Sequence, residues 1–384
     1  MKLFKSLLVA PAAIGLLSPL SASASEVNLN EISNYSDFSE VESMEFANSF
    51  SNDDSNYKTL LAGGEGLVDD YDGGFSETTS ASFTVAGYLG FTDDDDATAD
   101  DAVGSAFSFQ MDLNTSFTGE DSLDISIDAG TASTEAITEL DGNSLGAGLR
   151  VDGIAYTFPV GDKTTVIAGV DTDGSALFTT ACAYGGPGAQ LDDCANVNAG
   201  ITGGATTIGA SYDFGSGFTA AVGAQTANTS IFTDESSDAY AFNAAYIQDS
   251  YGLSLTYGVV ENAGLTDENK FTALNAYYTP ESSGLPSISV GYEVGDLGGA
   301  AAGADEQSSF MLGLTWDEIG PGSAGVALGH SNTVENADEL YKYEAYYDYP
   351  INDGMVVTPL IFTQDGAGNT DDTTGMMVKT TFTF

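Results

Sequence analysis

The chain is organised by a strict alternation of apolar and polar residues that recurs from residue 81 onward. In AFSFQMDLNTS, residues 106–116, the large apolar residues share the parity of Phe107 and the polar residues share that of Gln110. A short turn then leads to SLDISID, residues 122–128, which alternates in the same way. Period-two alternation bounded by turn residues predicts a β-hairpin with one apolar and one polar face.

The same pattern predicts sixteen strands in all. They are residues 81–91, seven hairpins and residues 375–384; the hairpins are 106–116/122–128, 153–160/163–170, 207–214/218–225, 239–246/253–260, 271–278/287–294, 309–316/324–330 and 341–350/355–362. Connections within hairpins are tight, whereas those between hairpins are long: 92–105, 130–147, 171–204, 227–237, 261–269, 296–307, 332–339 and 364–374.

This arrangement predicts an all-β fold, a transmembrane antiparallel β-barrel with short periplasmic turns and long outer loops. Strands of about 9–11 residues suit a tilted membrane crossing, and bacterial barrels of this kind have an even strand number. A soluble β-sandwich would also alternate, but it has no need of a short rim and a long rim. Aromatic residues before the short turns fit a girdle at the periplasmic interface.

The last strand ends on Phe382 and Phe384, which share one face. A terminal aromatic residue preceded by apolar residues at every second position resembles the C-terminal assembly signal of outer-membrane proteins. This resemblance implies that the barrel-assembly machinery is a partner and that outer-membrane lipid surrounds the barrel.

The beginning of the chain has a different character. Residues 1–25 combine Lys2 and Lys5 with an apolar stretch and a small-residue site, which predicts a secretory signal peptide. Residues 26–74 are acidic and polar with weak periodicity, so we expect a periplasmic N-terminal segment there and a barrel domain over 75–384. No later stretch approaches the roughly eighteen apolar residues of a transmembrane helix.

Charge excludes one class of partner. The chain has 57 acidic and 8 basic residues, for a net charge of −49. Nucleic-acid binding needs a basic surface and is therefore excluded, and an anionic membrane surface is disfavoured. Two explanations stay open: a solvated acidic exterior suited to salty water, or an acidic field that concentrates cations near a pore.

Parity assigns a set of polar side chains to the lumen. The set comprises Gln110, Asp112, Asn114, Asp124, Asp128, Asn243, Asn275, Glu293, Lys342, Glu344 and Lys379. Carboxylates outnumber lysines in it, which predicts a preference for cations. The alternative is that any water-filled lumen must be polar, which explains the alternation without selectivity.

The longest connection, 171–204, contains both cysteines of the chain. Two cysteines at close spacing in an exported protein predict a disulfide, here between Cys182 and Cys194. It is the third outer loop, and resemblance to general porins implies that it folds inward and sets a constriction. The acidic residues assigned to this constriction loop are Asp171, Asp173, Asp192 and Asp193. The alternative is an exposed loop that is crosslinked against proteolysis.

Arg150 breaks the pattern, because its parity assigns it to the lipid side of the fourth strand. An arginine is costly there. Either it lies near the outer end, above the apolar band, or a bulge shifts the phase of the strand after Asp152.

No metal, cofactor or catalytic site is predicted. His330 is the single histidine, so no Cys/His cluster is available for zinc. It shares the apolar parity of Val326 and Leu328 in its strand, which argues against a role as the base of a hydrolase. FTDDDDATADDA, residues 91–102, lacks the EF-hand pattern and fits a solvated acidic loop.

Four segments carry a family resemblance: MKLFKSLLVAPAAIGLL, KTLLAGGEGLVDDYDGGFSETTSAS, FQMDLNTSFTGEDSLDISIDAG and TFPVGD. They resemble porins of marine cyanobacteria in the carbohydrate-selective porin family, sometimes labelled iron-uptake porins. The resemblance implies a trimeric outer-membrane channel for passive diffusion of small hydrophilic solutes, with carbohydrates or inorganic ions including iron as substrates. One feature differs from that family, since residues 26–74 show no surface-layer-homology pattern. The alternative is a barrel that acts as a surface adhesin or structural protein without transport, and ion conduction distinguishes the two.

Overall fold

The computed structural model describes residues 79–93, 103–132, 146–189, 191–229, 231, 233, 237–261, 267–281, 284–300, 303–368 and 372–384. The predicted signal peptide and the predicted segment 26–74 lie outside these residues. No helix in the described part of the chain is long and apolar enough to cross a membrane. The described strands are β1 (Thr79–Asp93), β2 (Gly104–Thr115), β3 (Ser122–Gly130), β4 (Gly146–Val160), β5 (Thr164–Thr172), β6 (Ala205–Gly215), β7 (Phe218–Thr226), β8 (Ala239–Ile247), β9 (Tyr251–Glu261), β10 (Glu268–Tyr278), β11 (Ser287–Asp296), β12 (Glu306–Ile319), β13 (Gly322–Val334), β14 (Lys342–Asn352), β15 (Met355–Gln364) and β16 (Thr373–Thr383).

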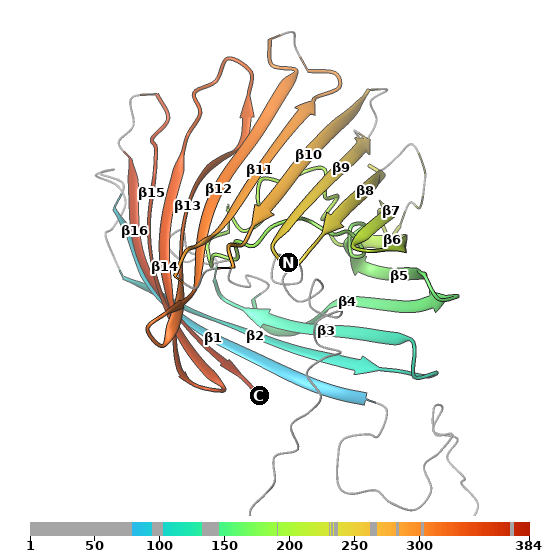
Figure 1. Ribbon diagram of the computed structural model, residues 1–384, viewed down its shortest axis with the longest axis horizontal. Helices are drawn as coiled ribbons and strands as arrows, with labels where there is room; N and C mark the ends of the chain where they lie inside the picture. The colour runs from blue at the N-terminus through green and yellow to red at the C-terminus, as the bar shows by residue number, and fades with distance from the viewer. Residues whose placement is uncertain are drawn as a thin grey trace, which may run out of the picture. The chain divides into compact units, whose positions relative to one another are not determined.

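The sheet closes on itself into a barrel, which Figure 1 shows as a ring of strands. Each strand pairs antiparallel with the next in sequence, and β1 also pairs with β16, from Thr84↔Thr383 to Asp93↔Thr374. Closure removes both open edges, so backbone groups that an edge would expose find partners. The predicted antiparallel barrel of sixteen strands is therefore confirmed.

The two faces of each strand differ as the alternation predicts, and β11 is the clearest case. Val290 and Tyr292 are 40% and 48% exposed, whereas Ser289 and Glu293 are each 1% exposed. Since successive side chains of a strand point to opposite faces, the apolar set covers the outside and the polar set faces the interior.

The two rims of the barrel differ in loop length. Connections 161–163, 216–217, 320–321 and 353–354 follow even-numbered strands, whereas the longest connection, 173–204, follows β5. We call these the short-turn rim and the long-loop rim. Aromatic rings pair at the short-turn rim, with centroid distances of 5.5 Å for Tyr156–Phe158, 4.7 Å for Tyr212–Phe214, 4.2 Å for Phe218–Tyr246 and 5.4 Å for Phe83–Phe384.

The final residue belongs to the barrel seam. Phe384 and Phe83 exchange two backbone hydrogen bonds, of 2.9 and 3.1 Å, and their rings stack. The side chains of Phe382 and Phe384 are exposed. Their role as an assembly signal stays a prediction.

A bulge in β4 changes the assignment of Arg150. The register passes from Ser126↔Gly153 directly to Ile127↔Val151, so Asp152 is an extra residue on β4. One extra residue reverses the facing of every side chain on one side of the bulge.

The exposed side chains follow this reversal. Val151 and Ile154 are both exposed large apolar residues although they lie three positions apart. Arg150, which pairs in register with Asp128, therefore has the parity opposite to that of Val151. Of the two explanations for Arg150, the bulge is therefore confirmed: the phase of β4 changes at Asp152, and simple parity cannot be carried through it to place Arg150 on the outer face.

One short turn is held by a carboxylate. Asp121 Oδ1 accepts hydrogen bonds from Ser116 Oγ and from the Phe117 and Thr118 backbone amides, at 2.8–2.9 Å. Its Oδ2 accepts a bond of 2.6 Å from the Tyr156 hydroxyl. The bond from Tyr156, supported by those from Thr118 and Ser116, holds the pKa of Asp121 well below its usual range.

Replacing Asp121 with Asn should lower the unfolding temperature of the barrel by a few degrees, because the amide loses the charge that these donors stabilise. The measurement follows the loss of the compact folded band on heating in detergent. Because a lowered carboxyl pKa stabilises the fold above the unfolded pKa of about 4, the wild-type advantage should disappear as the pH falls below that value. Asp353→Asn, in another short turn, is the charge-matched control, and an equal loss in both variants would contradict the assignment.

Candidate functional site

The connection between β5 and β6, residues 173–204, lies within the ring of strands, where Figure 1 shows it in green. Inward-facing side chains of β8 to β11 and of β14 bind it. We call residues 173–184 the outbound limb, which runs from β5 toward β14. Residues 191–204 are the returning limb, which leads back to β6.

Amide and hydroxyl groups of the wall bind the backbone of the outbound limb. Asn243 on β8 pairs with both backbone groups of Thr179: its Oδ1 accepts from the Thr179 N–H at 3.0 Å, and its Nδ2 donates to the Thr179 carbonyl at 3.1 Å. On β9, Ser254 Oγ accepts from the Ala181 N–H at 2.8 Å. These side chains act as a neighbouring strand would, by satisfying backbone groups that have no ladder.

Tyr184 fixes the tip of the outbound limb. Its backbone N–H donates to Ser289 Oγ at 3.0 Å, and its hydroxyl donates to Glu344 Oε1 at 2.5 Å. Its ring lies edge-on to that of Tyr346, with centroids 5.9 Å apart. Burial, and then the nearby Glu344 carboxylate, raise the pKa of Tyr184, so the hydroxyl keeps its proton and remains the donor.

Glu293 on β11 holds the returning limb. Its Oε2 accepts from the backbone N–H groups of Asn198 and Ala199 at 2.9 and 2.8 Å, and its Oε1 accepts from Asn198 Nδ2 at 2.7 Å. On β10, Asn275 Nδ2 donates to the Cys194 carbonyl at 2.6 Å. A buried carboxylate that receives three donors is well compensated for its lost hydration.

The base of the loop closes at the barrel wall. Asp173 Oδ1 accepts from the Gly203 N–H at 2.9 Å, which joins the first residue of the loop to its far end. On β7, Gln225 Oε1 accepts from the Gly174 N–H at 3.0 Å. Both ends of the loop are therefore fixed beside the strands that they connect.

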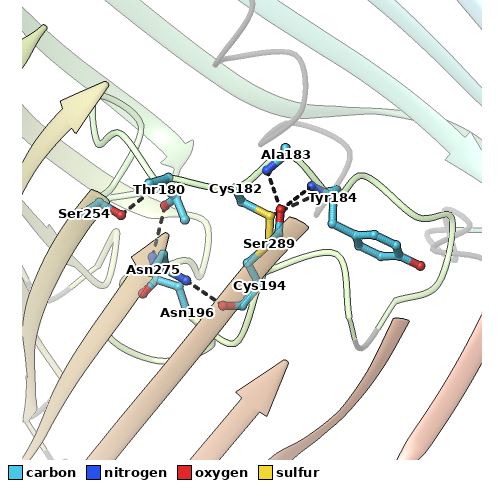
Figure 2. Close-up of a disulfide and its surroundings, with 10 residues drawn as sticks. Thr180, Cys182, Ala183, Tyr184, Cys194, Asn196, Ser254, Asn275 and Ser289 are labelled. Atoms are coloured by element: carbon cyan, nitrogen blue, oxygen red, sulfur yellow. Dashed lines mark hydrogen bonds between the residues drawn. A yellow bond between two sulfur atoms is a disulfide. The ribbon is translucent and has the colours of Figure 1, made fainter. Parts of the chain in front are cut away.

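A disulfide joins the two limbs, as predicted. Cys182 of the outbound limb is bonded to Cys194 of the returning limb, with Cα atoms 6.3 Å apart, and Figure 2 shows the disulfide between the labelled residues. Asn196 Nδ2 donates to Thr180 Oγ1 at 3.2 Å beside it, as a second link between the limbs. In the chain-entropy model a disulfide closing so short a loop contributes about 3 kcal/mol.

Inward-facing glycines let the loop backbone approach the wall, a feature that the sequence analysis missed. A Cβ at Gly291 would lie 2.6 Å from the carbonyl carbon of Cys194, and one at Gly258 would lie 2.8 Å from the carbonyl oxygen of Ala199. At Gly329 a Cβ would lie 2.9 Å from a loop leucine methyl. The signal was present, since each glycine stands at a polar-parity position of its strand and glycine within a strand often marks a close approach.

The predicted lumen residues fall into two groups. Asn243, Asn275, Glu293 and Glu344 bind the loop, as described above, and are buried. Lys342, on β14 with Glu344, is also buried and lies over the Phe362 ring at 5.0 Å. The other group lies on β2, β3 and β16 and comprises Gln110, Asp112, Asn114, Asp124, Asp128 and Lys379.

The second group forms a polar network of its own. Gln110 Nε2 donates to the Asp112 carboxylate at 3.0 Å, Ser126 Oγ donates to Asp112 Oδ1 at 2.9 Å, and Asn114 Nδ2 donates to Asp124 Oδ1 at 2.5 Å. Gln110 and Asp128 are buried, whereas Asp112 and Asp124 are partly exposed and Asn114 is exposed. Lys379 lies over the Tyr88 ring at 5.9 Å.

The four acidic residues assigned to the constriction loop occupy three places. Asp171 belongs to β5, which extends to Thr172, and it accepts a bond of 2.8 Å from Asn228 Nδ2. Asp173 closes the base of the loop, and Asp192 and Asp193 lie in the returning limb. The loop is therefore shorter than predicted at its first end.

Solved structures with a similar fold include two porins. OprB of Pseudomonas putida matches with a TM-score of 0.59 and 12% identity, over 80% of this chain and 94% of that protein. A mutant of the Rh. blastica porin matches with a TM-score of 0.56 and 16% identity, over 80% of this chain and 100% of that porin. At these identities the likeness concerns the fold alone. No family model matches the chain, and no curated protein matches its sequence.

Gly291→Ala should displace the returning limb, because the added Cβ would crowd the Cys194 carbonyl; overpacking of this kind costs about 1–3 kcal/mol. The measurement is chymotrypsin cleavage of the folded barrel at Tyr184 and Leu191, which are buried in the wild type. Gly87→Ala on β1 is the control, since nothing lies within 4 Å of its added Cβ. Equal protection of the two variants would show that the loop does not depend on this approach.

Proposed function

We propose that the chain forms a water-filled channel across an outer membrane for passive diffusion of small hydrophilic solutes. One observation carries the proposal: the outside of a closed barrel exposes large apolar side chains on strand after strand, among them Leu89, Phe107, Ile154, Ile208, Val222, Leu255, Leu274, Val290 and Ile361. A water-soluble protein rarely exposes so continuous an apolar surface. A bilayer favours it, and it also requires the closed hydrogen-bond ladder that the barrel provides.

Tyr88, Leu360, Phe362 and Met377 of β1, β15 and β16 are buried in an apolar cluster with Tyr184 and Leu191 of the loop. The proposed passage therefore runs along β2 to β4 and past Lys379 of β16. Asp112 and Asp124 line this side, and Lys379 and Arg150 are basic groups on it. Because Asp152 on β4 adds a third partly exposed carboxylate to Asp112 and Asp124, the excess of negative charge favours cations. The loop, held at both limbs, is proposed to narrow the channel from the other side.

The resemblance to cyanobacterial porins adds proposals about solutes and assembly. Carbohydrates or inorganic ions including iron are the substrates it implies, in a homotrimer inserted by the barrel-assembly machinery. The fold likeness to OprB and to the Rh. blastica porin agrees with a channel.

Reconstituted in a planar bilayer, the protein should conduct in discrete steps and show a cation-selective reversal potential in a salt gradient. The double substitution Asp112→Asn and Asp124→Asn should shift that potential toward zero. Asp353→Asn, on an exposed turn, should leave it unchanged. A potential that is unchanged in the double variant would refute the proposed passage. A folded barrel without conductance would refute the channel and favour the adhesin alternative.

Glu293→Ala should increase the single-channel conductance, because three donors of the returning limb lose their acceptor. Each donor left unsatisfied costs about 1–3 kcal/mol, enough to free this limb from the wall. The compact folded band should persist, because the barrel ladder is untouched. Glu318→Ala, an exposed residue near the end of β12, is the control. Unchanged conductance in a variant with a released loop would mean that the loop does not narrow the channel.

A further inference from the structure

A cavity of about 470 Å³ opens at the long-loop rim, between the returning limb and the connection 335–341. Asp193 and Val197 of the returning limb form one side of it, and Asp338 and Leu340 of the connection form the other. Thr333 near the end of β13 and Gln364 at the end of β15 also line it. The volume lies within the range of small-molecule sites, about 300–1,000 Å³.

A bulge shapes the β13 side of this cavity. The register passes from Phe310↔His330 to Ser308↔Thr333, so two residues of β13 stand against one of β12. One of them, Asn332, has φ 56°, a left-handed conformation that a non-glycine residue keeps only where its surroundings require it.

Hydrogen bonds supply that requirement. Asn332 Oδ1 accepts from Asn198 Nδ2 at 2.7 Å and from Gln307 Nε2 at 2.6 Å, and its backbone N–H donates to Ser309 Oγ at 3.0 Å. Asn198 is the residue whose amide and backbone also bind Glu293. The β13 side and the returning limb are therefore joined in one network, which fixes the cavity before any ligand arrives.

The connection 335–341 is equally well held. The Tyr341 N–H donates to Asp365 Oδ2 at 3.2 Å, and the Asp365 N–H donates to the Tyr341 carbonyl at 2.8 Å. Asn336 Nδ2 donates to the Gly303 carbonyl at 2.9 Å. This connection is thus tied to the connections 297–305 and 365–372, and the returning limb is tied to β11, so a ligand need not order either side on binding.

The chemistry of the lining selects one kind of ligand. Asp193 and Asp338 contribute carboxylates from opposite sides, Thr333 and Gln364 contribute neutral polar groups, and Val197 and Leu340 contribute apolar surface. Among the described residues that line the cavity none is basic. Anions are therefore repelled, whereas an ammonium group on a short apolar stem matches both the charge and the apolar contacts.

We propose that this cavity binds small organic cations that carry ammonium groups. Its position at the long-loop rim would place the bound cation at the mouth of the proposed channel, so this part of the inference rests on the proposed function. Binding itself does not, because it needs only the cavity and its two carboxylates.

The first test is calorimetric titration of the full-length folded barrel in detergent with 1,4-diaminobutane, at about 0.15 M salt to screen the exterior charge. We expect saturable binding of the diamine and none of 1,4-butanediol, which has a similar stem without charge. Asp338→Asn, on an exposed connection, and Asp193→Asn should each weaken binding by roughly tenfold or more. Asp353→Asn, at the other rim, should leave it unchanged.

The proposal is overturned if Asp353→Asn weakens diamine binding as much as the cavity variants do. It is also overturned if neither cavity variant alters saturable binding. Either result would mean that the acidic surface attracts the diamine in general. The absence of saturable binding to the wild type would overturn the proposal as well. Current block by the diamine in bilayers separates the two proposals. Binding without conductance would keep the cavity and refute the channel, whereas conductance without binding or block would keep the channel and refute the cavity.

Discussion

Pairing of β1 with β16 is the interaction on which the rest of the molecule depends. It closes the sheet, so that one face of every strand becomes the inner surface of the barrel and the other face becomes the outer surface. The seam is closely packed. Met377 of β16 is fully buried, and a Cβ at Gly90 of β1 would lie 2.7 Å from its Cγ. The pairing continues through Phe83 and Phe384, whereas the first residues of β1, from Thr79 to Ser82, pair with β2 alone. An open sheet of the same sequence would bury neither face.

Once the wall is closed, its inner face must satisfy two different needs. Residues 173–204 lie inside without a ladder of their own, and their backbone groups need partners. Asn243, Ser254, Ser289 and Glu293 supply these partners on β8, β9 and β11. On β2 and β3 the polar groups bond chiefly with one another, and Asp112, Asn114 and Asp124 among them keep at least partial exposure. Inward-facing positions are thus polar for two different reasons. On one side of the barrel they bind the loop backbone, and on the other they face solvent.

This double cause explains what the sequence could predict. Alternation gave the strand number, the closed antiparallel order and the contrast between rims, because side-chain period and turn chemistry are local properties. Alternation also predicted that Asn243 and Glu293 face inward, yet parity says nothing about what lies over a residue. Asp152 shows the other limit, since a single inserted residue reversed the facing of Arg150 without any marked change in composition.

The burial of acidic groups under the loop also changes how the net charge should be interpreted. Glu293 is satisfied by three donors and Glu344 receives the Tyr184 hydroxyl, so neither carboxylate is presented openly to a solute. The electric field of carboxylates on the exterior is screened over a Debye length of about 8–10 Å at ordinary ionic strength. This length is shorter still in salty water. The total of −49 is therefore a poor guide to selectivity. A passing ion responds to the few partly exposed groups near it, so Asp112 and Asp124 matter more than the many acidic residues elsewhere in the chain.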